Sequence, residues 1–429
     1  MPGRYRPNQR LDAEARPENR TEAERDHDRI LYTSAFQRLA GITQITAPES
    51  GLTIHNRLTH TLKVAQVARR LARRIGLAAD RQEVAAAGAL AHDLGHPPFG
   101  HLAEKALNKQ AEPWGGFEGN AQSFRIVTFL ALRDADYRGL NLTRRTLNAI
   151  LKYPWRQDIT DEKKKEKWGV YESEQRYFEF ARAGYAEDQP SLEAAIMDWS
   201  DDVTYAVHDL EDFFRLGLIP LERLGAAEDT ERRRFIEGFY ARPGELQTKF
   251  RLAGFTDRDL IDATARLFVA SSAPFGLIEP YRGGRRDRTN LRDQTSYLIG
   301  RFIGAAAKDE ERLKIAGEQR AEVAVLKEVA WFYVITDPSL ATIQHGQAKL
   351  IRELHEVYIR AASNLESDGK LFPLAQRELL ERIRAPREAK RVATDFVAGL
   401  TEDMAYELYH RLTGISRGSI VDAAAQASR

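Results

Sequence analysis

Three things are missing from this sequence: cysteine, an excess of one charge, and any long apolar run. The absence of cysteine excludes disulfides, cysteine-ligated zinc and thiol nucleophiles. The 64 lysines and arginines nearly balance the 63 aspartates and glutamates, so net charge does not call for a nucleic-acid or membrane partner. No apolar run approaches the roughly 18 residues of a membrane-spanning helix, and residues 1–26 lack the apolar stretch of a secretory signal. We therefore expect a cytoplasmic protein.

Strand signals are also scarce, and apolar residues mostly recur at the spacing of amphipathic helices. We therefore predict an all-α protein with one short exception. Residues 42–54 place β-branched residues around a Pro-Glu-Ser-Gly turn, which predicts a short β-hairpin. Residues 1–20, polar and rich in proline and arginine, are expected to form a flexible arm. Residues 21–220 should form the main helical core, and residues 221–429 a helical region packed on that core.

Several predicted helices have clear boundaries. Thr21 is a suitable N-cap, and Glu24 three residues later completes a capping box. A long helix over residues 56–76 should end at Gly76. The alanine-rich segment 81–95 is expected to be a central helix, because small side chains let other helices approach closely.

A concentration of imidazoles and carboxylates follows this alanine-rich segment. The stretch "AHDLGHPPFGHLAE" contains His92, Asp93, His96, His101 and Glu104. Imidazole nitrogen and carboxylate oxygen together suit a hard or borderline divalent ion. Adjacent residues on a helix point about 100° apart. The His-Asp pair can therefore hold one ion only at a helix end or between packed helices, and further ligands must come from other helices.

Two other helices offer such ligands. His60 lies in line with apolar residues of its helix and should face the interior, where a neutral imidazole needs a partner. Asp201, Tyr205 and Asp209 are spaced i, i+4, i+8 and line one helix face over roughly 12 Å. Such a row is costly to bury unless something uses it. An ion at Asp201, with a polar ligand extending toward Tyr205 and Asp209, would satisfy the row.

Each of these features alone has a simpler explanation. His60 could be an ordinary core histidine, and Asp201 a solvated or capping residue. His96 and His101 could merely hydrogen-bond to backbone near the Pro-Pro turn. The order His, then His-Asp, then Asp, on three helices of an α-rich chain, favours one mononuclear metal site.

These motifs resemble those of the HD-domain phosphohydrolases, and more narrowly those of the deoxyguanosinetriphosphate triphosphohydrolase family. The resemblance runs over nearly the whole chain. It rests on "ERDHDRILYTSAFQRLAGITQ", "HNRLTHTLKVAQVARRLAR", "AHDLGHPPFGHLAE", "GGFEGNAQSFRI", "LKYPW", "KWGVYESE", "SDDVTYAVHDLEDFF" and "KRVATDFVAGLTEDMAYELYHRLTG".

The resemblance implies a helical HD core with helical additions, and hydrolysis of a deoxynucleoside triphosphate to the deoxynucleoside and intact triphosphate. It implies one divalent ion, for which two imidazoles and two carboxylates favour Mn²⁺, with Co²⁺, Fe²⁺ and Zn²⁺ also suitable and Mg²⁺ less so. It further implies a homo-oligomer, often a hexamer, and activation by nucleotides or single-stranded DNA.

The resemblance also implies roles for individual residues. The implied metal ligands are His60, His92, Asp93 and Asp201. Arg57 would contact the phosphates, while Tyr205 and Asp209 would hold the sugar 3′-hydroxyl.

The remaining roles concern proton transfer and the base. His101 and Glu104 would form a dyad that transfers a proton to the leaving 5′-oxygen. His96 is expected to line the place where the phosphate reacts. Gln44, beside the expected hairpin, is our candidate for a contact with the base.

The chain departs from part of the family at one position. Where that part reads Phe-Glu-His-Asn, this chain has Gly119, which cannot supply an imidazole. Two other functions remain open: hydrolysis of another nucleotide such as a monophosphate, and nucleotide or single-strand-DNA binding with weak catalysis. The arginine-rich stretches 68–76 and 283–292 could serve the latter, although solvated helix faces would explain them too. We interpret the charged run 156–175 as an exposed connection.

Overall fold

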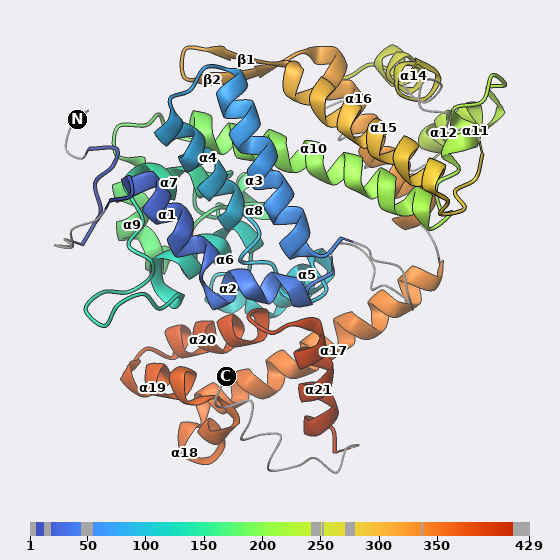
Figure 1. The fold of residues 1–429 in the computed structure, drawn as a ribbon. Coiled ribbons are helices and arrows are strands. Elements are labelled where there is room, and N and C mark those ends of the chain that lie inside the picture. The colour runs from blue at the N-terminus through green and yellow to red at the C-terminus, as the bar shows by residue number, and fades with distance from the viewer. Residues whose placement is uncertain are drawn as a thin grey trace.

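The structure is a computed structural model that describes residues 6–12, 19–43, 55–241, 250, 253–270, 279–335 and 338–414. Nearly all regular structure in these ranges is helical (Figure 1), which confirms the all-α prediction. Among the described helices, none combines the length and the apolar character that crossing a bilayer requires.

The first half of the described chain is a bundle of helices arranged around one central helix, α4. The helices of this bundle are α1 (Glu22–Leu31), α2 (Ser34–Arg38), α3 (Arg57–Arg74), α4 (Ala79–Ala91), α5 (His101–Ala111), α6 (Gly119–Arg125), α7 (Arg144–Ile150), α8 (Glu162–Glu166), α9 (Gln175–Arg182) and α10 (Leu192–Arg215).

Helix α4 is central because its side chains are small. Its residues from Val84 to Ala91 are all buried, and α1, α3, α7 and α10 all pack against it. Gly88 of α4 meets Ala149 of α7 so closely that a Cβ on Gly88 would lie 3.0 Å from the Ala149 carbonyl oxygen. This crowding holds the end of α4, where the His-Asp pair follows, at a fixed place between α3 and α10.

Two predicted helix boundaries hold, whereas the alanine-rich helix predicted to end at Gly95 ends at Ala91, because the chain turns at the His-Asp pair. Thr21 and Glu24 form the expected capping box at the start of α1. Gly76 follows the end of α3 with a φ of 79°, in the left-handed region that favours glycine. Residues 6–12 lie against this bundle through Arg10, which forms 2.6 Å ion pairs with both Glu22 and Asp26.

The hairpin predicted over residues 42–54 lies mostly outside the described residues. At its edges, Thr43 and Asn56 form an isolated antiparallel bridge. The described part of the chain has its sheet elsewhere, as an antiparallel pair of β1 (Ala306–Asp309) and β2 (Arg312–Ile315).

This pair was not expected from the sequence. Ala306 lies opposite Ile315, and Asp309 opposite Arg312. Each strand has four residues, most of them not buried, so the segment has no long alternation of apolar and polar residues to reveal it.

Residues 221–335 extend the bundle along α10. They contribute α11 (Leu221–Leu224), α12 (Thr230–Tyr240), α14 (Asp257–Ala265), α15 (Arg285–Gly304) and α16 (Gly317–Ala330). Figure 1 shows them gathered at the end of α10 that points away from α1 and α9. Their buried apolar residues belong to the same core cluster as those of α3, α4 and α10.

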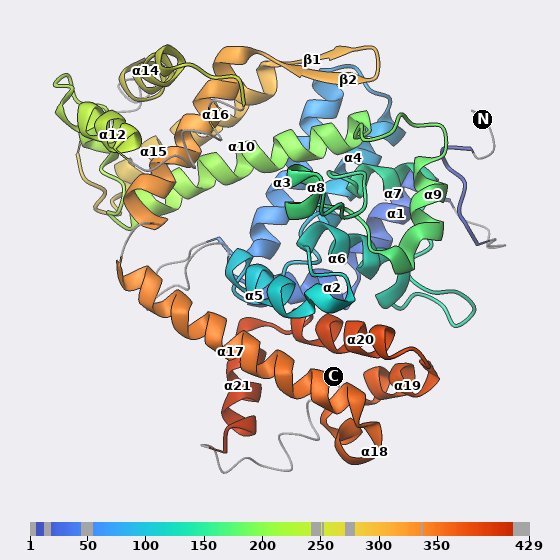
Figure 2. The ribbon, with the colours of Figure 1, turned by 180° about the vertical axis from the view of Figure 1, so that it is seen from behind.

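A second core lies on the other side of the bundle. It is built by α17 (Pro338–Ser363), α18 (Leu365–Asp368), α19 (Leu374–Arg382), α20 (Pro386–Ala398) and α21 (Glu402–Leu412). These helices form a layer beneath α2 and α5 in both views (Figures 1 and 2). Helix α5 completes this core by burying Ala103, Leu107 and Ala111 in it.

Two arginines, the partly buried Arg38 and the buried Arg125, join this layer to the bundle. Arg38 donates to the carbonyl oxygens of Leu94 (2.7 Å) and His96 (2.9 Å), and also to those of Ala398 and Leu400. The loop after α4 and the end of α20 are thus held by one guanidinium. Arg125 of α6 forms a 2.8 Å ion pair with Asp395 of α20 and a 2.5 Å ion pair with Glu174.

A close approach between Gly95 and α6 gives the first testable prediction. A Cβ at Gly95 would lie 2.2 Å from the Gly119 carbonyl oxygen and 2.3 Å from the Ser123 nitrogen. Because both atoms are backbone, α6 would have to move. We expect Gly95→Ala to lower the free energy of unfolding by about 3 kcal/mol, measured by urea or thermal denaturation. The control is Gly300→Ala on α15, where nothing lies within 4 Å, and which should instead gain up to about 1 kcal/mol. Equal effects at the two positions would contradict this account.

Candidate metal centre and active site

The site begins where α4 ends. His92 is the C-cap of α4, and its Nδ1 lies 2.6 Å from the carbonyl oxygen of Ala89. This contact makes Nδ1 the protonated nitrogen and leaves the lone pair of Nε2 available. Ser123 of α6 donates to the His92 carbonyl oxygen and accepts from the Gly95 nitrogen, both at 2.8 Å. The turn after α4 is therefore fixed from two sides.

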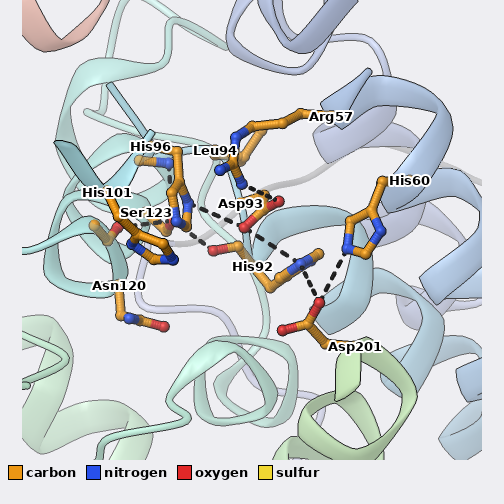
Figure 3. Close-up of polar contacts among 12 residues, drawn as sticks. Arg57, His60, His92, Asp93, Leu94, His96, His101, Asn120, Ser123 and Asp201 are labelled. Atoms are coloured by element: carbon orange, nitrogen blue, oxygen red, sulfur yellow. Dashed lines mark hydrogen bonds and ion pairs between the residues drawn. The ribbon is translucent and has the colours of Figure 1, made fainter. Parts of the chain in front are cut away.

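The four side chains predicted as metal ligands meet at this turn (Figure 3). His60 Nε2 lies 3.0 Å from Asp201 Oδ1, and His92 Nε2 lies 3.5 Å from the same oxygen. His92 Nε2 is also 3.3 Å from Asp93 Oδ1. His60 comes from α3, Asp201 from α10, and the other two from the end of α4, so the structure brings residues of three helices together.

The donor atoms of this group suit a cation. One ligand atom each from His60, His92 and Asp93 lies within 4.8 Å of the others. Within the described part of the chain, the buried Nε2 of His92 has no hydrogen-bond partner. Two nitrogens and two carboxylate oxygens form a set that first-row divalent ions accept, and the His92 nitrogen, which faces two carboxylates without a hydrogen bond, fits the role of a ligand.

The electrostatics of the site agree with that reading. Burial alone would lower the pKa of His92, but the Asp93 and Asp201 carboxylates outweigh it and raise this pKa to about 9. Burial would raise the pKa of Asp201, yet His92 and the hydrogen bond from His60 hold it well below its usual range. The pocket thus favours positive charge at the His92 nitrogen, which a divalent ion would provide.

Asp93 is also held by two groups outside the ligand set. Arg57 Nη1 lies 2.8 Å from Asp93 Oδ2, and His96 Nδ1 lies 3.0 Å from Asp93 Oδ1. Burial, followed by the positive charge of Arg57, lowers the pKa of His96 to about 4, so this imidazole is neutral near pH 7. Among the described residues, the buried Nε of Arg57 has no hydrogen-bond partner, so the guanidinium retains donor capacity.

A second group of titratable side chains, His96, His101 and Glu104, lies beside the candidate ligands. His101 starts α5, its side chain is 70% exposed, and its Nδ1 lies 2.9 Å from Glu104 Oε2. The His101 ring is 5.3 Å from the His96 ring, centroid to centroid. His96 therefore connects the ligand set to the exposed imidazole of His101, whose Nε2 is not used by Glu104.

Gly119 faces this second group. A Cβ at Gly119 would lie 3.6 Å from His96 Cε1 and 3.7 Å from Glu104 Oε2. The position at which this chain departs from part of the family that it resembles therefore lies against the predicted proton-transfer residues.

The predicted row on α10 continues away from the ligand set. Tyr205 is partly exposed and Asp209 is buried. Burial, with Asp209 next to it, raises the pKa of Tyr205 well above its usual range. In the described part of the chain, Asp209 Oδ2 has no hydrogen-bond partner. This row could bond to a polar ligand. Gln44, the predicted base contact, lies outside the described residues.

Two lysines near the site were missed by the sequence analysis. Lys152, in the "LKYPW" motif, forms an ion pair with Asp198 and lies 3.9 Å from Asp201 Oδ2. Lys167 lies 2.6 Å from Glu104 Oε1.

The interpretation of residues 156–175 as an exposed connection is wrong for its second part, because Trp168 and Tyr171 are buried. The apolar residues that follow the lysine-rich run could have indicated that this part of the segment is buried.

Comparisons with known proteins agree with this geometry. The family model described as "HD domain" matches residues 57–206, which contain all four candidate ligands. The model described as "Phosphohydrolase-associated domain" matches residues 313–411, from β2 to α21.

Curated relatives match nearly the full length. A protein of Streptomyces coelicolor named deoxyguanosinetriphosphate triphosphohydrolase-like protein is 38% identical over 92% of this chain and 93% of its own length. Proteins with the same name from Corynebacterium efficiens and an Azoarcus species are 36% and 33% identical, over 92% and 95% of this chain and over 92% and 93% of their own lengths.

The buried carboxyl of Asp209 gives a pH-dependent prediction. Burial and the nearby Asp212 raise the pKa of Asp209 well above its usual range. The unfolded chain loses this proton near pH 3.9, whereas the folded protein keeps it, so the contribution of Asp209 to stability falls as pH rises above about 4. We expect metal-free Asp209→Asn to be more stable than the wild type at pH 7, by about 1 kcal/mol, but not at pH 3.5. An equal difference in unfolding free energy at both pH values would contradict this expectation.

Proposed function

The chain belongs to the deoxyguanosinetriphosphate triphosphohydrolase-like proteins of the HD-domain phosphohydrolases, and from this premise we propose that it hydrolyses deoxynucleoside triphosphates to deoxynucleoside and triphosphate. The observation that carries the proposal is the convergence of His60, His92, Asp93 and Asp201, with an unpartnered nitrogen among them. We propose that these four residues hold one divalent ion, with Mn²⁺ favoured.

A row of donors and acceptors around this centre would orient the substrate. Arg57 is fixed by Asp93 and retains unused donors, which suit an anionic phosphate. Tyr205 and Asp209 lie one and two turns beyond Asp201 on α10, where a sugar hydroxyl could bond to the open Asp209 oxygen. The phosphates would then lie over the metal centre and the deoxyribose along α10.

Release of intact triphosphate fixes which bond breaks. Water must attack the α-phosphorus, and the bond from that phosphorus to the sugar 5′-oxygen must break. A bound divalent ion would act as a Lewis acid toward the α-phosphate. The guanidinium of Arg57 would stabilise the charge that develops on the phosphate oxygens.

The departing 5′-oxygen needs a proton, and the proposed donor is His101 protonated on both ring nitrogens, while the proton of the attacking water passes to solvent. Its Nδ1 is held by Glu104, so its Nε2 can face the substrate. His96, Asp93 and Arg57 connect this imidazole to the ligand set. A second ion at His96, His101 and Glu104 is disfavoured, because the ammonium of Lys167 already neutralises Glu104 at 2.6 Å.

The wider organisation follows from the same premise. We propose that residues 21–220 form the catalytic core and residues 221–429 an appended helical region. We also propose a cytoplasmic homo-oligomer, with a hexamer as the expected form, that nucleotides or single-stranded DNA activate.

Product analysis tests the proposed reaction. Purified protein is incubated with Mn²⁺ and each of the four deoxynucleoside triphosphates, singly and mixed, and the products are separated by ion exchange. We expect deoxynucleoside and triphosphate in equal amounts. Pyrophosphate or inorganic phosphate as the first product would replace this proposal with a different phosphohydrolase. Salt-dependent DNA binding without any hydrolysis would support a regulator.

Substitution of a ligand tests the centre itself. We expect Asp93→Ala and the milder Asp93→Asn to abolish turnover and to reduce the bound metal measured by mass spectrometry. The matched control is Asp202→Asn, because Asp202 neighbours Asp201 on α10 but pairs with Lys327 of α16. It should retain activity and metal. Wild-type turnover by a folded Asp93→Asn protein would show that the site is misassigned.

A further inference from the structure

Lys167 occupies a position between two buried carboxylates. Its Nζ lies 2.6 Å from Glu104 Oε1 and 3.0 Å from Glu118 Oε1. Glu104 uses its other oxygen to hold His101 Nδ1 at 2.9 Å. Glu118 uses its other oxygen to cap α6, accepting from the backbone nitrogens of its first residues. One ammonium thus connects the start of α5 with the start of α6.

The backbone of Lys167 is anchored by aromatic packing. Trp155 Nε1 donates to the Lys167 carbonyl oxygen at 2.7 Å, and the Gly169 nitrogen donates to the Trp155 carbonyl oxygen at 3.0 Å. Trp155, Trp168 and Tyr171 form a small core of their own. The Tyr171 hydroxyl also lies 3.2 Å from the Glu118 carbonyl oxygen. The "LKYPW" and "KWGVYESE" motifs therefore build a rigid support for this side chain.

We propose that Lys167 is a positioning residue, which holds the Glu104 carboxylate so that Glu104 can orient His101 for proton transfer. This inference rests on the proposed function, in which His101 protonates the 5′-oxygen. An ammonium has three donors, and two of them are used by the glutamates. Its effect on His101 would therefore pass through the Glu104 carboxylate, which contacts both side chains.

Charge balance explains why a cation is needed there. Glu104 and Glu118 are 6% and 1% exposed, and two such carboxylates side by side repel each other strongly. With Lys167 between them, both can remain ionised. Without it, the two would share a proton or move apart. In either case Glu104 would hold His101 less well, and the imidazole would lose its fixed orientation.

The first test is steady-state kinetics of Lys167→Met. We expect kcat to fall about 10- to 100-fold while KM changes less than about 3-fold, because the substrate contacts remain. Lys167→Arg, which keeps the charge, should recover most of kcat. Lys165→Met is the matched control, since Lys165 lies on the same segment but is exposed, and it should match the wild type.

Two double variants separate positioning from general damage. In a His101→Ala background, Lys167→Met should cause no further loss, because both changes remove the same step. Glu118→Gln removes the second carboxylate, so Lys167→Met combined with Glu118→Gln should recover most of the kcat lost by Lys167→Met alone. A raised KM with unchanged kcat, or additive losses with His101→Ala, would overturn the proposal.

A measurement without substrate keeps the inference separate from the proposed function. Imidazole ¹⁵N spectra of the metal-free protein should show His101 protonated at Nδ1 in the wild type, and a mixture of tautomers in Lys167→Met. If the wild type released no triphosphate from any deoxynucleoside triphosphate, the proposed function would fail while these spectra still tested the positioning. Unchanged His101 signals in a folded Lys167→Met protein would show that Lys167 does not orient His101.

Discussion

Two carboxylates that face the same imidazole of His92, the buried Asp93 and the partly buried Asp201, set the requirement that the rest of the site meets. Ionised groups of one sign are unstable in an interior unless opposite charge is placed against them. Arg57 from α3 supplies part of that charge to Asp93, and Lys152 lies on the far side of Asp201. The net charge that remains on the two carboxylates is negative, and it lies next to the imidazoles of His60 and His92. The helices around α4 bring the carboxylates together and leave a place for a cation.

The same principle operates a few residues further along the chain. Glu104 and Glu118 are a second buried acidic pair, but here the protein supplies the compensating cation itself, as Lys167. This difference separates the two neighbouring groups chemically. One is left short of positive charge and can take an ion, whereas the other is neutralised internally and can hold an imidazole in place. Arg57 and His96 lie at the boundary between them.

Much of this arrangement could be predicted from the sequence, and the reason is local. The α class, the cap at Thr21, the end of α3 at Gly76 and the shared face of Asp201, Tyr205 and Asp209 all follow from helical spacing and turn chemistry. The four candidate ligands could be named from the sequence because their order along the chain matches that of a known family. Such features are determined by residues close together in the sequence, or are indicated by a motif of a known family.

The parts that were missed depend on contacts between distant segments. Lys167 follows a lysine-rich run that resembles any solvated loop, and its position beside Glu104 depends on a backbone hydrogen bond from the distant Trp155. The hairpin of β1 and β2 is short and largely unburied, so periodicity carried no signal for it. Nothing in the sequence distinguishes Arg38 from a surface arginine. Its guanidinium nevertheless donates hydrogen bonds to four backbone carbonyl oxygens in two distant segments.

Helix α5 contributes both to the candidate active site and to the second hydrophobic core. Its first residue is His101, while its apolar face is buried by α17 and α20. Removing residues 338–414 would expose that face and leave Arg125 without Asp395. The segment that matches the HD family model therefore depends on residues 338–414 for part of its packing and for the partner of Arg125. A change on the apolar face of α5 therefore alters the packing of both matched segments.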